Sequence, residues 1–224
     1  MDKLKQLLIA LYISLGLYKK FTVFYADPPW SKNQKGKYGA INHYDLMTME
    51  RIEQMPIEYL AADNAFLFLW TPQGLIPEAL KVIEKWGFRY VDEMIWDKYN
   101  LGLGKYVRHT HETLLIGVRG KPEIMCKNQP SLIRAPRQDH SHKPEEFTVI
   151  IERLAKGPYL ELFARRKPSS GRPDEWYVWG NEIASDIYIP GYPVPEYSKK
   201  AALPAGNEAT EIVQEIEKLQ EEVE

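Results

Sequence analysis

The sequence has little cysteine and little net charge, and its apolar runs are short. Cys126 is the single cysteine among 224 residues, which excludes an intramolecular disulfide framework and a zinc site built from several cysteines. We therefore expect a reducing compartment such as the cytoplasm. The apolar run over residues 7–17 is too short to span a bilayer and lacks a small-residue cleavage site. We interpret residues 1–20 as a packed apolar helix and expect no membrane association.

The formal net charge is −2, but the charge is unevenly distributed along the chain. Residues 207–224 contain seven Glu and one Lys, so the remainder carries a net charge of +4. A mildly basic body is compatible with an anionic ligand or a nucleic acid, and it establishes neither. Residues 190–206 are rich in Pro and Gly and predict a linker. After it, an apolar stripe predicts an acidic amphipathic helix over 207–224, which either docks on its own body or serves a partner subunit or a homodimer.

Between these ends, apolar runs rich in β-formers alternate with segments of helical periodicity, which predicts one α/β domain over residues 21–189. The expected strands are Phe21–Ala26, Ala65–Trp70, Tyr90–Trp96, Thr113–Val118, Tyr159–Phe163 and Trp176–Trp179. The expected helices are Thr48–Leu60, Ile76–Trp86 and Pro144–Leu154, with Gly87 and Gly157 placed as helix ends. Such alternation is typical of a mostly parallel sheet flanked by helices, in which ligands bind beyond the carboxyl ends of the strands.

The tetrad Asp27, Pro28, Pro29 and Trp30 directly follows the first of these strands. The two prolines fix the backbone and remove two donors, so the strand ends in a rigid corner that aims a carboxylate and an indole at the ligand crevice. The amino group of adenine or cytosine is a poor nucleophile. A carboxylate and a proline carbonyl that accept its hydrogen bonds would orient it for methylation, while an aromatic ring stacks on the base. An ordinary strand-end turn with an Asp cap and a core Trp is the structural alternative.

With this motif, the sequence resembles the adenine-specific amino-methyltransferase family, which includes the catalytic subunit of the eukaryotic mRNA adenosine methyltransferase and bacterial and phage relatives. The similarity covers residues 21–185 in the family's order. Its further blocks are Phe66–Trp70, Val91–Trp96, Gly117–Gly120, Ser141–Glu146, Ile151–Leu154, Glu161–Arg165 and Gly180–Asn181. The resemblance implies a Rossmann-like methyltransferase fold that is circularly permuted, because the catalytic motif precedes the cofactor strand.

The resemblance also implies S-adenosylmethionine as cofactor and S-adenosylhomocysteine as product. Matched position by position, the cofactor-binding residues would be Asp27, Lys143, Phe163, Arg165, Asn181 and Glu182. A lysine suits a carboxylate, and Asn or Glu suits a ribose diol. Taken singly, Lys143 could instead precede a helix start, Arg165 could be a surface charge and Asn181 a turn residue.

For the nucleic acid, Trp30 is the aromatic residue that would stack on the base, and the resemblance marks Tyr44 and Glu112 as residues of the adenosine pocket. Basic residues in loops around Lys143 and Arg165 would contact phosphates, or would simply be solvated: Arg134, Arg137 and Arg166. The compact chain favours DNA over RNA as the substrate, with an RNA adenosine N6-methyltransferase as an alternative.

Two other functions compete with an adenine N6-methyltransferase. The pairs His109/His111 and His140/His142 suggest a metallohydrolase, but neither is completed by a carboxylate or cysteine at a recognised spacing, so we expect no metal. A non-catalytic nucleic-acid-binding subunit is the second alternative. Such subunits of the family lose the Asp-Pro-Pro-Trp tetrad, whereas this chain keeps it.

Overall fold

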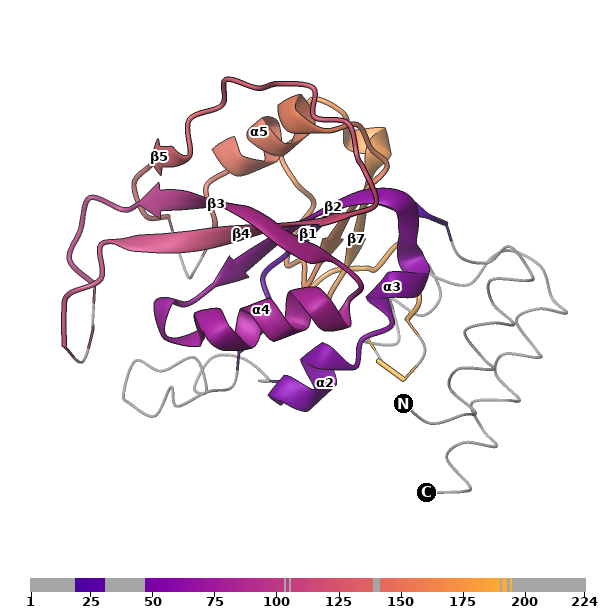
Figure 1. Ribbon diagram of the computed structural model, residues 1–224, viewed down its shortest axis with the longest axis horizontal. Helices are drawn as coiled ribbons and strands as arrows, with labels where there is room; N and C mark the ends of the chain where they lie inside the picture. The colour runs from indigo at the N-terminus through magenta and orange to yellow at the C-terminus, as the bar shows by residue number, and fades with distance from the viewer. Residues whose placement is uncertain are drawn as a thin grey trace, which may run out of the picture.

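The structure is a computed structural model, and it describes residues 19–30, 47–102, 104, 106–138, 142–189, 191, 192 and 194. Within them, a seven-stranded sheet has the order β5-β3-β4-β2-β1-β6-β7 (Figure 1). Its strands are β1 (Phe21–Ala26), β2 (Ala61–Thr71), β3 (Arg89–Asp97), β4 (His111–Arg119), β5 (Leu132–Arg134), β6 (Tyr159–Leu162) and β7 (Trp176–Trp179). The helices are α2 (Met49–Glu53), α3 (Ile57–Leu60), α4 (Ile76–Lys85) and α5 (Glu146–Leu154), with 3₁₀ turns at Gln73–Leu75 and Pro173–Glu175.

The sheet is mostly parallel, as the sequence predicts. Only β4 runs antiparallel to its neighbours β2 and β3, whereas β1 pairs in parallel with β2 and β6, and β6 with β7. The chain leaves β1 toward β2 on one side and later returns to β6 on the other side. The gap between the carboxyl ends of β1 and β6 is therefore the point where the strand order reverses, and open α/β sheets bind ligands at such points.

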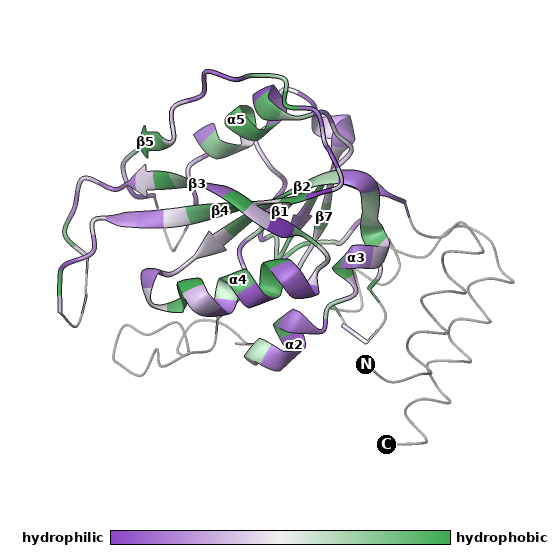
Figure 2. Cartoon of the chain, in the orientation of Figure 1, coloured by the Kyte–Doolittle hydropathy of each residue, from purple (hydrophilic) through white to green (hydrophobic). Residues whose placement is uncertain are grey.

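Both faces of the sheet are covered, because successive strand residues point to opposite sides. Phe24 belongs to a core that includes residues of α2 and α4, whereas its neighbour Tyr25 belongs to the core that includes α5. Figure 1 shows α5 on one side of the sheet and α2 and α4 on the other. The hydropathy colouring of Figure 2 marks hydrophobic stretches, in green, along the strands between them. This two-sided burial explains the continuously apolar strands of the sequence.

All six predicted strands are present, each within two residues of the prediction at either end apart from the start of β2, which begins four residues early. The helix predicted over Thr48–Leu60 is wrong as a single element, since it divides into α2 and α3 around Pro56, where proline removes a helical donor. The short edge strand β5 was not predicted. Gly87 adopts φ +81° directly after α4, a conformation that favours glycine, as expected for a helix end.

The packed domain extends beyond its predicted end at residue 189. Tyr192 and Val194 are buried in the core on the α2 and α4 side, and the Tyr192 hydroxyl donates to the Arg51 carbonyl at 2.8 Å. Arg51 in turn donates to the Gly191 carbonyl at 2.8 Å. The start of the predicted linker is therefore part of the domain.

The apolar helix predicted over 1–20 lies outside the described residues apart from positions 19 and 20, and so does the acidic helix predicted over 207–224.

Candidate active site

A cleft opens at the carboxyl ends of β1 and β6, where the strand order reverses. Asp27 follows β1 directly, and Phe163 follows β6. The cleft is lined by, among others, Asp27, Lys143, Glu161, Phe163, Arg165 and Arg166. Sequence positions more than a hundred residues apart thus meet at one sheet edge, and five of these six residues are ones that the sequence marks.

Two backbone hydrogen bonds tie down the Asp27–Trp30 corner. The Pro28 carbonyl accepts a hydrogen bond from the Trp30 amide at 2.8 Å, and the Pro29 carbonyl accepts one from the Met47 amide at 3.2 Å. A carbonyl oxygen has two lone pairs, so each proline carbonyl retains acceptor capacity. The corner can therefore present a carboxylate and carbonyl acceptors to an amine.

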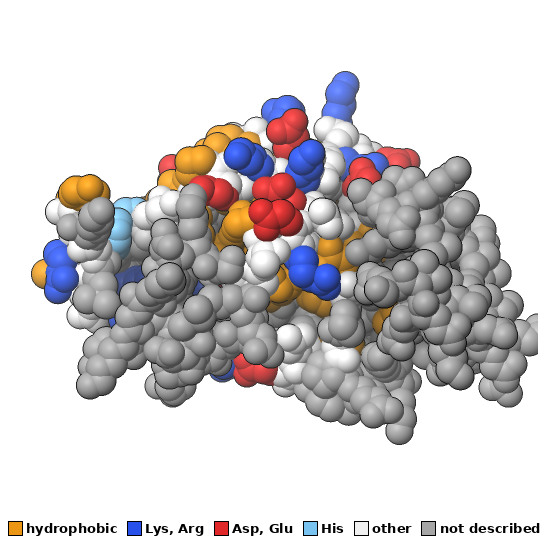
Figure 3. Space-filling view, turned by 90° about the horizontal axis from the view of Figure 1, so that it is seen from below, with side chains coloured by type: hydrophobic (Ala, Val, Ile, Leu, Met, Phe, Trp, Pro, Cys, Tyr) orange, Lys and Arg blue, Asp and Glu red, His pale blue; other side chains and the backbone are white. Residues whose placement is uncertain are grey.

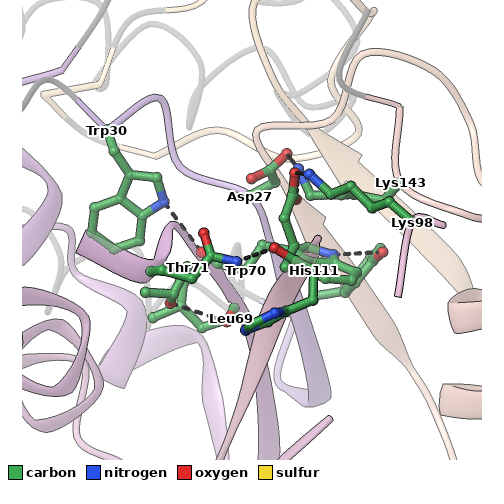
Figure 4. Close-up of polar contacts among 11 residues, drawn as sticks. Asp27, Trp30, Leu69, Trp70, Thr71, Lys98, His111 and Lys143 are labelled. Carbon is green, nitrogen blue, oxygen red and sulfur yellow. Dashed lines mark hydrogen bonds and ion pairs between the residues drawn. The ribbon is translucent and has the colours of Figure 1, made fainter. Parts of the chain in front are cut away.

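Four side chains of alternating charge form a continuous ion-pair chain beside this corner (Figure 4). The Lys143 ammonium lies 2.5 Å from Asp27 Oδ2 and 3.3 Å from Glu112 Oε2. The Lys98 ammonium pairs with the other oxygen of Glu112. Glu112, which the sequence places in the adenosine pocket, is thus linked to the catalytic candidate through Lys143.

Burial and neighbouring charges have opposite effects on the pKa values of the residues in this ion-pair chain. Burial raises the pKa of Asp27, and the Lys143 ammonium counteracts part of that rise. For Lys143, burial disfavours the charged form, but the carboxylates of Asp27 and Glu112 outweigh it and raise its pKa. Burial likewise opposes ionisation of Glu112, yet Lys143 and Lys98 lower its pKa overall. The charges of Lys143 and Glu112 are therefore maintained chiefly by their neighbours.

Trp30 is packed more deeply than a stacking platform requires. Its side chain is only 3% exposed, it belongs to the core on the α2 and α4 side, and its indole N–H donates to the Trp70 carbonyl at 3.1 Å. In this conformation Trp30 supports the corner from behind, as in the structural alternative for the motif. Its stacking on a base stays a prediction.

The segment that follows β6 forms the other wall of the cleft. Phe163 has φ 63°, an unusual backbone conformation for a bulky residue that is most often found at functional sites. Arg165 Nε donates to Glu182 Oε1 at 2.8 Å, and Asn181 lies exposed beside this pair. A side chain at Gly180 would come within 2.0 Å of the Ala164 carbonyl, so glycine allows these two segments to approach. The structure therefore brings together the predicted cofactor residues of the two segments.

A hydrogen-bond network on α5 holds the basic loop after β6. Glu152 is buried and accepts hydrogen bonds from the Trp176 indole at 2.8 Å and from the Ser170 hydroxyl. Ser170 Oγ accepts from the Arg172 amide at 2.8 Å. This loop carries Arg166, whose guanidinium lies 3.0 Å from His142 Nδ1 in the cleft.

The other predicted phosphate contacts lie elsewhere. Arg134 is the last residue of β5, not a loop residue beside Lys143, and it pairs with Asp97 at 3.2 Å at the far end of the sheet. Arg137 is exposed beyond it, and Tyr44 lies outside the described residues. On the face seen in Figure 3, described basic and acidic side chains are interspersed without a patch of one sign.

Two residues at this sheet edge were not predicted from the sequence. Lys98 follows the last residue of β3, and Glu161 interrupts the apolar strand β6. Burial, with the nearby Asp27 carboxylate, raises the pKa of Glu161 to about 8. A charged residue inside an apolar strand, or directly after one, is the sequence signal that could have identified them.

The described part of the chain offers no cluster of three or more His, Cys, Asp or Glu side chains that could hold a metal ion. His140 of the second histidine pair lies outside it. None of the helices in that part is long and apolar enough to cross a membrane.

A mostly parallel α/β sheet with an Asp-Pro-Pro-Trp corner at its switch point is a feature of amino-methyltransferases. Residues 21–182 match the MT-A70 family, and the chain belongs to that family. Human N(6)-adenosine-methyltransferase catalytic subunit METTL3 is 32% identical over 77% of this chain and 30% of its own length. The Drosophila melanogaster MT-A70-like protein is 28% identical over 88% of this chain and 32% of its own length.

A relative of more similar length is the type II methyltransferase M.MunI of Mycoplasma sp, which is 29% identical over 77% of this chain and 82% of its own length. The chain thus spans about a third of the length of the two animal relatives and most of the length of this one.

Proposed function

We propose that this protein transfers a methyl group from S-adenosylmethionine to the exocyclic N6 amine of adenine in a nucleic acid. The observation that carries the proposal is the position of Asp27, at the end of β1 and on the wall of the cleft that also contains Lys143 and Phe163. Family membership supports the same reaction, because the human relative is named an N(6)-adenosine-methyltransferase.

The residues of the cleft fit S-adenosylmethionine. The cofactor has a carboxylate, an ammonium, a positively charged sulfonium and a ribose diol, and the cleft supplies partners of opposite charge or hydrogen-bonding character. Lys143 and Arg165 offer cations, and Asp27 and Glu161 offer carboxyl groups. The residues that would hold the cofactor are Asp27, Lys143, Phe163, Arg165, Asn181 and Glu182. When bound, S-adenosylmethionine would supply an electrophilic methyl group to the amine and leave as S-adenosylhomocysteine, and the methylated amine would release one proton to solvent.

The corner orients the nucleophile. The Asp27 carboxylate accepts a hydrogen bond from the amine, and a proline carbonyl of the tetrad accepts the second one. Both acceptors hold the nitrogen in place and favour a pyramidal geometry, which makes its lone pair available. Lys143 favours the ionised form of Asp27, which accepts hydrogen bonds and donates none. Arg166, at the mouth of the cleft, is positioned to contact a phosphate.

DNA is the substrate that we favour, because the chain matches the type II methyltransferase M.MunI over 82% of that protein's length, against 30% of the length of METTL3. The alternatives are an RNA substrate and a non-catalytic role as the nucleic-acid-binding subunit of a complex. The intact tetrad argues against the second of these, since an inactive subunit has no need of it. We also propose a circularly permuted methyltransferase fold, with Asp27 before the cofactor strand β6, and a reducing compartment such as the cytoplasm.

The test is transfer of labelled methyl groups from S-adenosylmethionine to single-stranded DNA, duplex DNA and RNA, followed by digestion to nucleosides. We expect N6-methyladenine from at least one DNA substrate, and at least about a hundredfold less of it with the Asp27→Asn variant. Label in RNA alone would correct the substrate. Label in another nucleoside, or no label with any of the three polymers, would overturn the proposed function.

A further inference from the structure

The ion-pair chain beside the cleft continues past the residues that the family resemblance marks. Its last member, Lys98, is held at the base of the connection between β3 and β4, where its amide donates to the Thr110 carbonyl at 2.9 Å. Its ammonium pairs with Glu112 and lies 5.1 Å from the centre of the Trp96 ring. The Lys98 side chain is 17% exposed, so this contact is largely shielded from water.

The order of charges along the ion-pair chain indicates that Lys98 compensates the charge of Glu112. Lys143 lies between two carboxylates, at 2.5 Å from Asp27 and 3.3 Å from Glu112. Glu112 has a second cation, Lys98, so its charge is compensated without drawing Lys143 away from Asp27. Without Lys98, two partly buried carboxylates would share one ammonium, and the four-residue chain would change from neutral to a charge of −1. An unbalanced buried charge is costly, so Lys143 would move toward Glu112.

We propose that Lys98 is a positioning residue for methyl transfer. It compensates the charge of Glu112, so that the Lys143 ammonium stays beside Asp27. Lys143 then remains available to bind the carboxylate of S-adenosylmethionine. This role rests on the proposed function. In this role Lys98 does not contact the reacting atoms, because it acts through Glu112 and Lys143. Both lysines, labelled in Figure 4, reach the Glu112 carboxylate, and Lys143 also reaches Asp27.

The pH dependence follows from the groups that face Asp27. They are Tyr25 on β1, Glu112 on β4, Lys143 before α5, Glu161 on β6 and Arg165 after it. Lys98 is not in this set, but its loss would draw Lys143 from Asp27 toward Glu112; the ionised Asp27 carboxylate would then lose support and its pKa would rise. Since the ionised Asp27 is the hydrogen-bond acceptor, activity would then appear only at higher pH.

The experiment compares Lys98→Met with Lys98→Arg, and uses Lys85→Met as the matched control, because Lys85 is an exposed lysine at the end of α4 on the other side of the sheet. We expect Lys98→Met to lower kcat about tenfold and to move the acid limb of the pH profile upward by about half a unit. Lys98→Arg should restore the wild-type profile, and Lys85→Met should leave both quantities unchanged.

A double-mutant cycle with Glu112→Gln separates positioning from folding. With a neutral residue at position 112, Lys98 has no carboxylate to compensate, so Lys98→Met should add little further loss of kcat. Additive losses, or a wild-type pH profile in Lys98→Met, would overturn the inference while the proposed function stands. Absence of methyl transfer in the wild-type protein would overturn both.

Discussion

The ammonium of Lys143 lies 2.5 Å from Asp27 Oδ2, a contact between residues 116 positions apart. The sequence motifs assign Asp27 to the transfer step and Lys143 to the cofactor, and the structure joins them in one ion pair. Substitution of either residue therefore changes the electrostatic environment of the other.

Replacement of Asp27 by Asn keeps its shape and removes its charge. We expect methyl transfer to fall at least about a hundredfold, because an acceptor in the reacting geometry contributes on the order of 3 kcal/mol. Cofactor affinity should change only by a small factor, since the other predicted cofactor residues, among them Arg165 and Asn181, are unchanged. Single-turnover transfer and calorimetry measure the two effects, with the exposed Asp174→Asn as control. Near-normal turnover would remove Asp27 from the mechanism.

The predicted cofactor contacts are tested by Lys143→Ala and Asn181→Ala. Each variant should weaken S-adenosylmethionine binding roughly tenfold or more, because each removes a polar anchor from a small ligand. Calorimetry at fixed pH is the measurement, and Lys156→Ala, an exposed lysine after α5, should bind as the wild type does. Unchanged affinity in both variants would show that the cofactor binds elsewhere.

The basic residues Arg134 and Arg166 are predicted to contact the nucleic-acid backbone from opposite ends of the catalytic sheet edge. Their double replacement by Ala should weaken binding of all sequences. For each lost contact, the slope of log affinity against log salt should decrease by about 0.9 for duplex DNA and about 0.7 for a single strand. Arg153→Ala, on the exposed side of α5, is the control. An unaltered slope would mean that the strand runs elsewhere.

Glu161 makes folding stability depend on pH. Its pKa is about 8 in the folded protein against an ordinary value of 4.5, so between these values the folded state binds more protons than the unfolded state. Stability attributable to this group therefore falls as pH rises through that window. The melting temperature of Glu161→Gln minus that of the wild type should increase from pH 5 to pH 8. A constant difference would contradict the prediction, and Glu84→Gln on α4 is the control.

Substitution of Trp30 tests whether its ring stabilises the core or binds the substrate. It is 3% exposed and bonded to the Trp70 carbonyl, so Trp30→Ala should destabilise the fold by about 3–5 kcal/mol. Urea denaturation measures the loss. Trp30→Phe keeps an aromatic face and most of the volume, and should lose less. A stable Trp30→Ala variant that binds nucleic acid poorly would instead assign the ring to base stacking.

The sequence alone determined most of the framework. The apolar strands, α4 and α5 were predictable because local patterning decides them, and Pro28 and Pro29 impose a rigid corner wherever they stand. The family motifs were recognisable because their order along the chain is independent of how the chain is folded. Pro56 inside the segment Thr48–Leu60 is itself a sequence signal for the division into α2 and α3.

Tertiary structure decided which charges meet. Neither the antiparallel direction of β4 nor the edge strand β5 follows from periodicity, because strand direction and pairing depend on contacts distant in sequence. The direction of β4 and the pairing of β5 place Glu112 beside Lys143 and Lys98, and Arg134 far from Arg166. The raised pKa of Glu161 and the paired state of Asp27 likewise arise from burial and neighbours that exist only in the folded chain.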